Sequence, residues 1–140
     1  MSNLSTIHAD IVPTAQISQL CKAAGDPLRM QILRVLQQNS YGVLELCQVF
    51  NIRQSAMSHH LKIMASAGLV SKRREGTTLF YRRNFCNPHG QLQELQATLF
   101  ESLDRLSLSD AISAQLDRIN AERSAASVEF FNANATRFEA

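Results

Sequence analysis

Residues 53–83, "RQSAMSHHLKIMASAGLVSKRREGTTLFYRR", contain a helical pattern that changes to an extended one at Gly68. Before Gly68, apolar residues recur at the three- and four-residue spacing of a helix, which predicts a helix over residues 54–67. After Gly68, two short runs rich in Val, Thr, Phe and Tyr lie on either side of "EGT". This pattern predicts a β-hairpin whose turn uses Gly76.

Further helices are predicted on both sides of this stretch. Residues 43–50 form a short helix that ends at Asn51, and with residues 54–67 they make a helix-turn-helix. Upstream, residues 14–24 form one helix, and Asp26 caps another that begins with proline. The order of helix-turn-helix and hairpin predicts a mainly α fold with a small β-hairpin, which is a winged helix-turn-helix.

Positive charge is concentrated in the same stretch. Residues 51–83 carry seven basic side chains against Glu75 alone, a net charge of +6, whereas the whole chain carries +2. Such a concentration is expected for a polyanion partner. Met57, Leu61 and Met64 share one face of the predicted helix and point to the core, so the opposite, polar face is free to enter a major groove. The candidate DNA-contacting residues on this helix are Gln54, Ser55, Ser58, His59, Lys62 and Ser66. On the hairpin the basic residues are Lys72, Arg73, Arg74, Arg82 and Arg83, with Thr77, Thr78 and Tyr81 between them.

The adjacent histidines do not predict a metal site. Consecutive residues on a helix point about 100° apart, so His59 and His60 cannot both serve one compact site. We interpret His59 as a groove contact and His60 as a residue that packs or contacts phosphate. The chain lacks an acid pair, a nucleophile motif and a Gly-rich phosphate loop, so we expect no enzymatic activity and no cofactor.

The region after the hairpin is predicted to be helical and to carry a narrow seam of leucines. Such a seam can be the core of the domain itself, but in a small domain it commonly packs against a second copy. We predict a homodimer whose interface contains Ile17, Leu20, Leu92, Leu95, Leu99 and Leu103.

The remaining composition indicates a cytoplasmic protein. Cys21, Cys47 and Cys86 are widely spaced without a C-x-x-C pair, and we interpret them as small buried apolar residues in a reducing compartment. No apolar run approaches the roughly 20 residues that span a bilayer, and the N-terminus lacks the layout of a secretory signal. We therefore expect no membrane contact.

Two segments carry a family resemblance. "AAGDPLRMQILRVL" (residues 23–36) and "VFNIRQSAMSHHLKIMASAGLVSKRREGTTLFYR" (residues 49–82) resemble the ArsR/SmtB family of bacterial transcriptional repressors. The resemblance covers about residues 17–83 and implies a winged-helix homodimer that binds a double-stranded DNA operator until a small inducer releases it. By position, it implies DNA contacts from Gln54, Ser55, Ser58, His59 and Lys62 on the helix and from Arg73, Arg74, Thr77 and Tyr81 on the hairpin. Arg53 departs from the family, which usually has a capping Ser or Thr at that position.

We therefore predict an ArsR-type repressor with two parts. Residues 1–106 form the winged helix-turn-helix DNA-binding and dimerisation domain, and residues 107–140 form a C-terminal helical extension. The inducer, a metal or a small molecule, is not identified. The positions of the arsenic-responsive Cys-x-Cys pair read Gly42 and Leu44, and residues 91–106 contain no histidine for a zinc site. Cys86 and His89 have C-x-x-H spacing and are weak metal candidates.

Two alternatives remain open at this point. Residues 119–140, "INAERSAASVEFFNANATRFEA", resemble the junction in family members that are fused to an S-adenosylmethionine-dependent methyltransferase. On that alternative the chain is the DNA-binding half of a fusion. On the other, it is a dimeric protein-interaction module whose basic hairpin binds an acidic protein surface.

Overall fold

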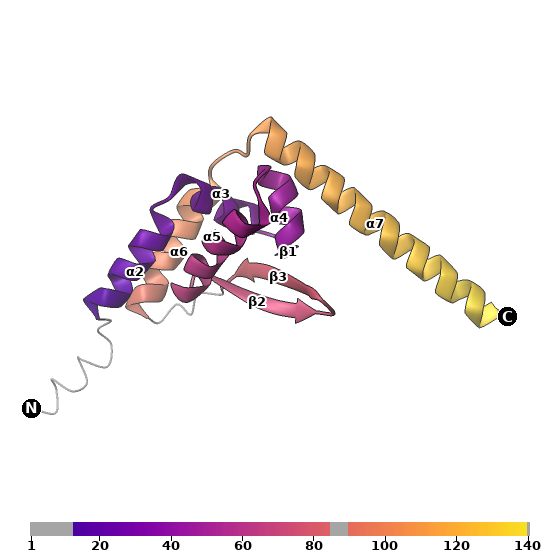
Figure 1. Ribbon diagram of the computed structural model, residues 1–140, viewed down its shortest axis with the longest axis horizontal. Coiled ribbons are helices and arrows are strands. Elements are labelled where there is room, and N and C mark those ends of the chain that lie inside the picture. The colour runs from indigo at the N-terminus through magenta and orange to yellow at the C-terminus, as the bar shows by residue number, and fades with distance from the viewer. Residues whose placement is uncertain (1–12, 85–89, 140) are drawn as a thin grey trace, which may run out of the picture.

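The computed structural model describes residues 13–84 and 90–139, with side chains described up to residue 128. A group of helices packs beside a small antiparallel sheet, and the last helix extends away from this body (Figure 1). The helices are α2 (Thr14–Ala24), α3 (Pro27–Val35), α4 (Val43–Phe50), α5 (Gln54–Ser66), α6 (Gln91–Asp104) and α7 (Asp110–Glu139). The strands are β1 (Tyr41–Gly42), β2 (Val70–Glu75) and β3 (Thr78–Arg83). The predicted mainly α fold with a helix-turn-helix and a hairpin is confirmed.

The helix ends follow from local chemistry. The carboxylate of Asp26 accepts a hydrogen bond from the backbone N–H of Arg29 at 3.0 Å, which caps α3 as predicted. Asn51 ends α4 with a φ of 52°, a left-handed value that asparagine tolerates better than most residues. Gly68 follows α5 with a φ of 81°. Asn51 thus lies in the turn between the two helices of the helix-turn-helix, and Gly68 lies between α5 and the hairpin.

The hairpin is joined to the helix-turn-helix by a third strand. β2 and β3 pair antiparallel with Glu75 opposite Thr78, and Gly76 turns the chain with a φ of 63°. β1 pairs with the other edge of β3, so the sheet order is β1-β3-β2. β1 leads directly into α4 and also pairs with β3. The sheet therefore connects the first helix of the helix-turn-helix to the hairpin of β2 and β3, which is the wing. The sequence did not predict β1, since two residues are too few to show an alternating pattern.

The core contains the inward faces of these elements. Side chains of α2, α3, α4, α5 and the sheet form one core cluster, and several of them are completely buried. The largest of them are Tyr41, Leu20, Ile32, Leu33, Leu46, Met57, Leu61, Met64 and Leu69.

The leucine seam of α6 lies differently from the prediction. The buried stripe of α6 consists of Gln96, Phe100 and Leu103, and it packs on the body of the protomer. Leu20 and Leu103 are 1% and 5% exposed, so both belong to the core of one protomer and their assignment to the dimer interface was wrong. Phe100 and Gln96 take the inward position, which turns the neighbouring stripe outward. Leu95 on that stripe is 43% exposed.

Several other predicted residues have a different environment. Cys21 is exposed, so the prediction that the cysteines are buried was wrong for it. Cys47 is partly buried, and this burial raises the pKa of its thiol. Cys86 and His89 lie outside the described residues.

Helix α7 begins on the body and then leaves it. Ile112, Leu116 and Ile119 are buried, whereas residues 124–128 are exposed. Figure 1 shows the remainder of α7 projecting past the sheet. Among the described residues, no helix combines the length and apolar character that crossing a bilayer requires.

Candidate nucleic-acid interface

Helix α5 has one buried and one exposed face, as the spacing predicted. Met57, Leu61 and Met64 are 0% exposed and fix the helix in the core. The opposite side of the helix is polar and faces solvent. Its exposed residues are Gln54, Ser55, Ser58, His59 and Lys62. Hydroxyl, amide, imidazole and ammonium groups of this kind can hydrogen-bond base edges and phosphates in a major groove.

His60 positions α5 and does not share a site with His59. A nitrogen of the Arg29 guanidinium, Nη1, lies 3.0 Å from Nδ1 of His60. Because a guanidinium can only donate, Nδ1 is the acceptor. The same guanidinium donates to the backbone oxygens of Ala23 at 2.6 Å and Lys22 at 3.2 Å. Arg29 therefore links α5 to the end of α2. This role could not be predicted from the sequence, because Arg29 and His60 are 31 positions apart.

The N-terminus of α5 is open. Arg53 occupies the N-cap position and its side chain makes no capping hydrogen bond. The first N–H groups of the helix consequently lack a side-chain acceptor from the N-cap. Free N–H groups and the helix dipole create positive potential, which favours a phosphate at this end.

The wing presents a basic surface, with one exception to the prediction. Arg73, Arg74 and Thr77 are exposed. Arg73 pairs with Glu75 at 2.5 Å, but both side chains remain more than half exposed, at 66% and 55%. Tyr81 is 6% exposed, so its assignment as a DNA contact was wrong. It lies on the face of β3 that points to the core, and burial raises the pKa of its hydroxyl group.

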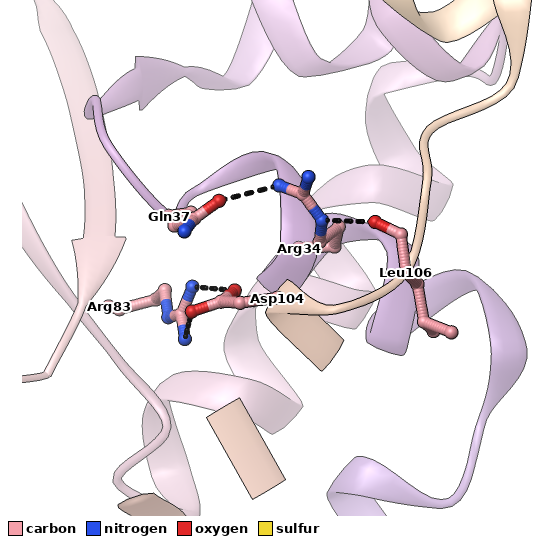
Figure 2. A network of polar contacts seen from close by, with 5 residues as sticks. All are labelled: Arg34, Gln37, Arg83, Asp104 and Leu106. Carbon is pink, nitrogen blue, oxygen red and sulfur yellow. Dashed lines mark hydrogen bonds and ion pairs between the residues drawn. The ribbon is translucent and has the colours of Figure 1, made fainter. Parts of the chain in front are cut away.

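The base of the wing is attached to α6. Arg83 donates to both carboxylate oxygens of Asp104, at 2.8 and 3.1 Å, and its guanidinium lies 4.1 Å from the centroid of the Phe100 ring. Figure 2 shows this pair beside Arg34, which donates to the Leu106 backbone oxygen at 2.9 Å. Arg83 is thus a structural residue of the hairpin, and its charge is already paired.

A second link joins α6 to the end of α5. The amide of Gln96, which is only 5% exposed, donates to the backbone oxygen of Gly68 at 3.1 Å. Asn84 donates to the same oxygen at 2.6 Å. These two hydrogen bonds fix the position of α6, and of the leucines on its outer face, relative to α5 and the wing.

Ligands for a metal ion do not gather around these elements. Within residues 13–84 and 90–128, whose side chains the structure describes, no group of three or more His, Cys, Asp or Glu side chains could hold a metal ion. The arrangement is instead a polar helix face with a basic hairpin beside it.

The chain is similar to known proteins in sequence and in fold. Residues 26–72 match the family model described as "Bacterial regulatory protein, arsR family". The arsenical resistance operon repressor of Bacillus subtilis is 35% identical over 83 residues, which cover 59% of this chain and 79% of the repressor.

Two solved structures are similar in both fold and sequence. HlyU from Vibrio cholerae superposes with a TM-score of 0.52 at 31% identity, covering 64% of this chain and 92% of HlyU. A domain from Mycobacterium bovis, described as a homodimeric winged helix-turn-helix DNA-binding domain, superposes with a TM-score of 0.52 at 30% identity. That match covers 64% of this chain and 80% of the domain.

Proposed function

This chain belongs to the ArsR family of bacterial regulatory proteins, and from that premise we propose that it binds a double-stranded DNA operator as a homodimer and represses transcription until a small inducer releases it. The family model describes regulatory proteins and not enzymes, which agrees with the expectation that the chain is not an enzyme. The observation that carries the proposal is the two-sided character of α5. Its apolar face is fully buried, so its polar face is the one available for a partner.

The proposed contacts combine α5 and the wing. In the proposed complex, Ser55, Ser58 and His59 contact base edges, and Lys62 contacts a phosphate or a guanine. Their exposure on α5 supports this assignment. Arg73 and Arg74 extend the contact along the phosphate backbone or into the minor groove. Gln54 and Thr77 complete the proposed surface.

The homodimer sets the form of the operator. Two copies of α5 related by a twofold axis reach two successive major grooves, about 34–36 Å apart. The operator should therefore be an inverted repeat with half-sites about one helical turn apart. The homodimeric M. bovis domain supports this arrangement, as does the outward-facing leucine stripe of α6.

Selection from random duplexes tests the proposal, because the operator sequence is unknown. The full chain should enrich an inverted repeat, and Lys62→Ala and Arg74→Ala should each weaken binding to it. Each lost phosphate contact should also reduce the slope of log K against log salt by about 0.9. Arg118→Ala is the matched control, because Arg118 is exposed on α7, outside the proposed surface. Enrichment of no duplex would support the protein-interaction alternative, and unchanged gel shifts in both variants would refute the assignment of this face.

The inducer and the methyltransferase alternative need a separate experiment. The family match ends at residue 72, so the resemblance of residues 119–140 to a fusion junction remains a prediction. Calorimetric titration of the full chain with zinc, arsenite and S-adenosylhomocysteine distinguishes a metal inducer from an S-adenosyl compound. Heat of binding with only the last of these would favour the link to methyltransferase fusions.

A further inference from the structure

A groove of about 700 Å³ lies between α2 and α5, beside the proposed DNA-contacting face. Lys22 comes from α2, Arg29 from the start of α3, and His59 and Lys62 from α5. Its size falls within the range of about 300–1,000 Å³ that is typical of small-molecule sites. No residue that lines it is acidic.

The groove has an apolar floor and a cationic rim. Ala23 and Ile63 are buried or partly buried in its wall, whereas Lys22 and Lys62 are exposed at its edge. An inorganic ion would contact the lysines at the rim but would leave the apolar side chains of the groove uncovered. The combination fits a molecule that has an anionic group and an apolar body.

Arg29 gives this groove a fixed hydrogen-bond donor. Its guanidinium is held by Ala23, Lys22 and His60, so it is already oriented before a ligand arrives. A guanidinium has five N–H donors, and the contacts seen in the described part of the chain use three of them. The remaining donors suit a carboxylate, sulfonate or phosphate oxygen, which arginine binds in a planar geometry.

From this geometry we propose that the groove between α2 and α5 binds a small organic anion with an apolar body. Resting on the proposed function, we infer that such an anion competes with DNA, because His59 and Lys62 belong to both surfaces. The inducer would then act directly at the DNA-contacting face and would need no metal site.

The groove remains open in the proposed dimer. On α2 it uses Ala15, Ser18 and Lys22, which follow one another at helical spacing along one face. Ile17, the α2 residue of the proposed interface, points about 100° or more away from each of them. A second copy packed on Ile17 and α6 would therefore leave this groove accessible.

A fluorescent probe tests binding without DNA. The probe is 8-anilinonaphthalene-1-sulfonate, which joins a sulfonate to an apolar ring system and becomes brighter when it is bound. Lys22→Gln removes a rim charge from an exposed position and should weaken probe binding about five- to tenfold, the effect of losing one charge-assisted contact. Arg118→Gln, the matched control on α7, should bind as the wild type does. The neutral analogue N-phenyl-1-naphthylamine should bind wild type and Lys22→Gln equally.

Competition forms the second arm of the experiment. The sulfonate probe should displace a selected duplex from the wild-type chain, and Lys22→Gln should require about five- to tenfold more probe for the same displacement. Equal probe affinity in wild type and Lys22→Gln would overturn the proposal. So would a Lys22→Gln variant that loses DNA affinity while the wild type binds no probe, because the groove would then be a phosphate-contact surface only. If the probe binds through Lys22 but no duplex is ever selected, the anion site stands and the proposed function fails.

Discussion

Arg53 occupies the N-cap of α5 without capping the helix. A serine at this position can accept a hydrogen bond from the N–H of the second or third helical residue, which an arginine does not do. Arg53→Ser should therefore raise the free energy of unfolding by about 1 kcal/mol. Urea denaturation at one protomer concentration measures the change, because the stability of a dimer depends on concentration. Arg53→Ala, which lacks the oxygen, should gain less, and equal stability of the Ser and Ala variants would show that no cap forms.

Asp26, unlike Arg53, caps its helix, α3, and the capping group is a charged carboxylate. The backbone N–H of Arg29 holds the pKa of the Asp26 carboxyl group below its ordinary value of 3.8. A lowered pKa in the folded state means that the ionised carboxylate stabilises the fold at neutral pH and that this contribution is lost as the pH falls through the folded-state pKa. Asp26→Ala should cost about 1 kcal/mol at pH 7. Urea denaturation from pH 7 to pH 2 should show this cost shrinking at the acid end, whereas the stability difference between Asp26→Asn, a neutral cap, and Asp26→Ala should stay nearly constant, because neither variant titrates at this position.

At the scale of elements, one arginine fastens α7 to the helix-turn-helix. Arg123 Nε donates to Glu45 at 2.9 Å, a second nitrogen of Arg123 donates to the other carboxylate oxygen, and the guanidinium lies 4.9 Å from the Tyr41 ring centroid. The hydroxyl of Tyr41 also donates to Asn120 at 3.2 Å. These contacts attach α7 to α4 and to β1.

A double-mutant cycle with Arg123→Met and Glu45→Gln measures the strength of this attachment. The side chains of Arg123 and Glu45 are 36% and 26% exposed, and the contact between them is bidentate. We therefore expect a coupling energy of about 1 kcal/mol or more. Arg73 and Glu75 provide the matched pair in the same chain, at 66% and 55% exposure, and should couple by less than about 0.5 kcal/mol. Equal coupling in both cycles would contradict the attachment of α7 through this pair.

The same scale shows why the sequence predicted some elements and not others. The hairpin and α5 have local signals, since Gly68, "EGT" and the spacing of Met57, Leu61 and Met64 are visible in the chain. For α6 the spacing predicts an apolar stripe, but it does not show which of two neighbouring stripes faces the core. In the structure the stripe with Phe100 faces inward. The burial of Tyr81 depends on the pairing of β3 with β1, which has no sequence pattern.

Attachments between distant residues left no local signal either. Arg83 and Asp104 are 21 positions apart, and Arg123 and Glu45 are 78 positions apart. In the sequence, nothing near these four residues distinguishes them from charged residues on an exposed surface. Arg83 therefore counted toward the basic hairpin, although the fold uses it to hold the hairpin on α6.

For the whole molecule, the position of α6 determines how two copies meet. Gln96, Phe100 and Leu103 fix one face of α6 to the body, and Leu92, Leu95 and Leu99 lie on the adjacent face. Leu92 and Leu99 are partly buried, whereas Leu95 is 43% exposed. A second copy that covers this stripe together with Ile17 would remove exposed leucine from water, a gain of about 25 cal/mol for each Å² buried. We therefore retain Ile17, Leu92, Leu95 and Leu99 as the proposed interface.

Leu95→Glu should separate the dimer without unfolding the protomer, because the side chain is already largely outside the core. Light scattering at micromolar concentration should give twice the chain mass of 15.6 kDa for the wild type and the single mass for Leu95→Glu. Leu106→Glu is the matched control, since Leu106 is 58% exposed and lies outside the proposed interface. Circular dichroism should show the same helix content in all three chains. A wild type of single mass would refute the dimer.

DNA binding by the same variants connects oligomeric state to function. In a dimer, binding of one α5 raises the effective concentration of the second at its half-site, so an inverted repeat gains affinity over a single half-site. Leu95→Glu should lose this gain and bind the repeat and the half-site equally, whereas Leu106→Glu should keep it. Lys62→Ala should instead weaken both duplexes and keep the preference for the repeat. These two patterns distinguish a defect in assembly from a defect in the DNA-contacting face, and a Leu95→Glu monomer that still prefers the repeat would show that the preference does not arise from this interface.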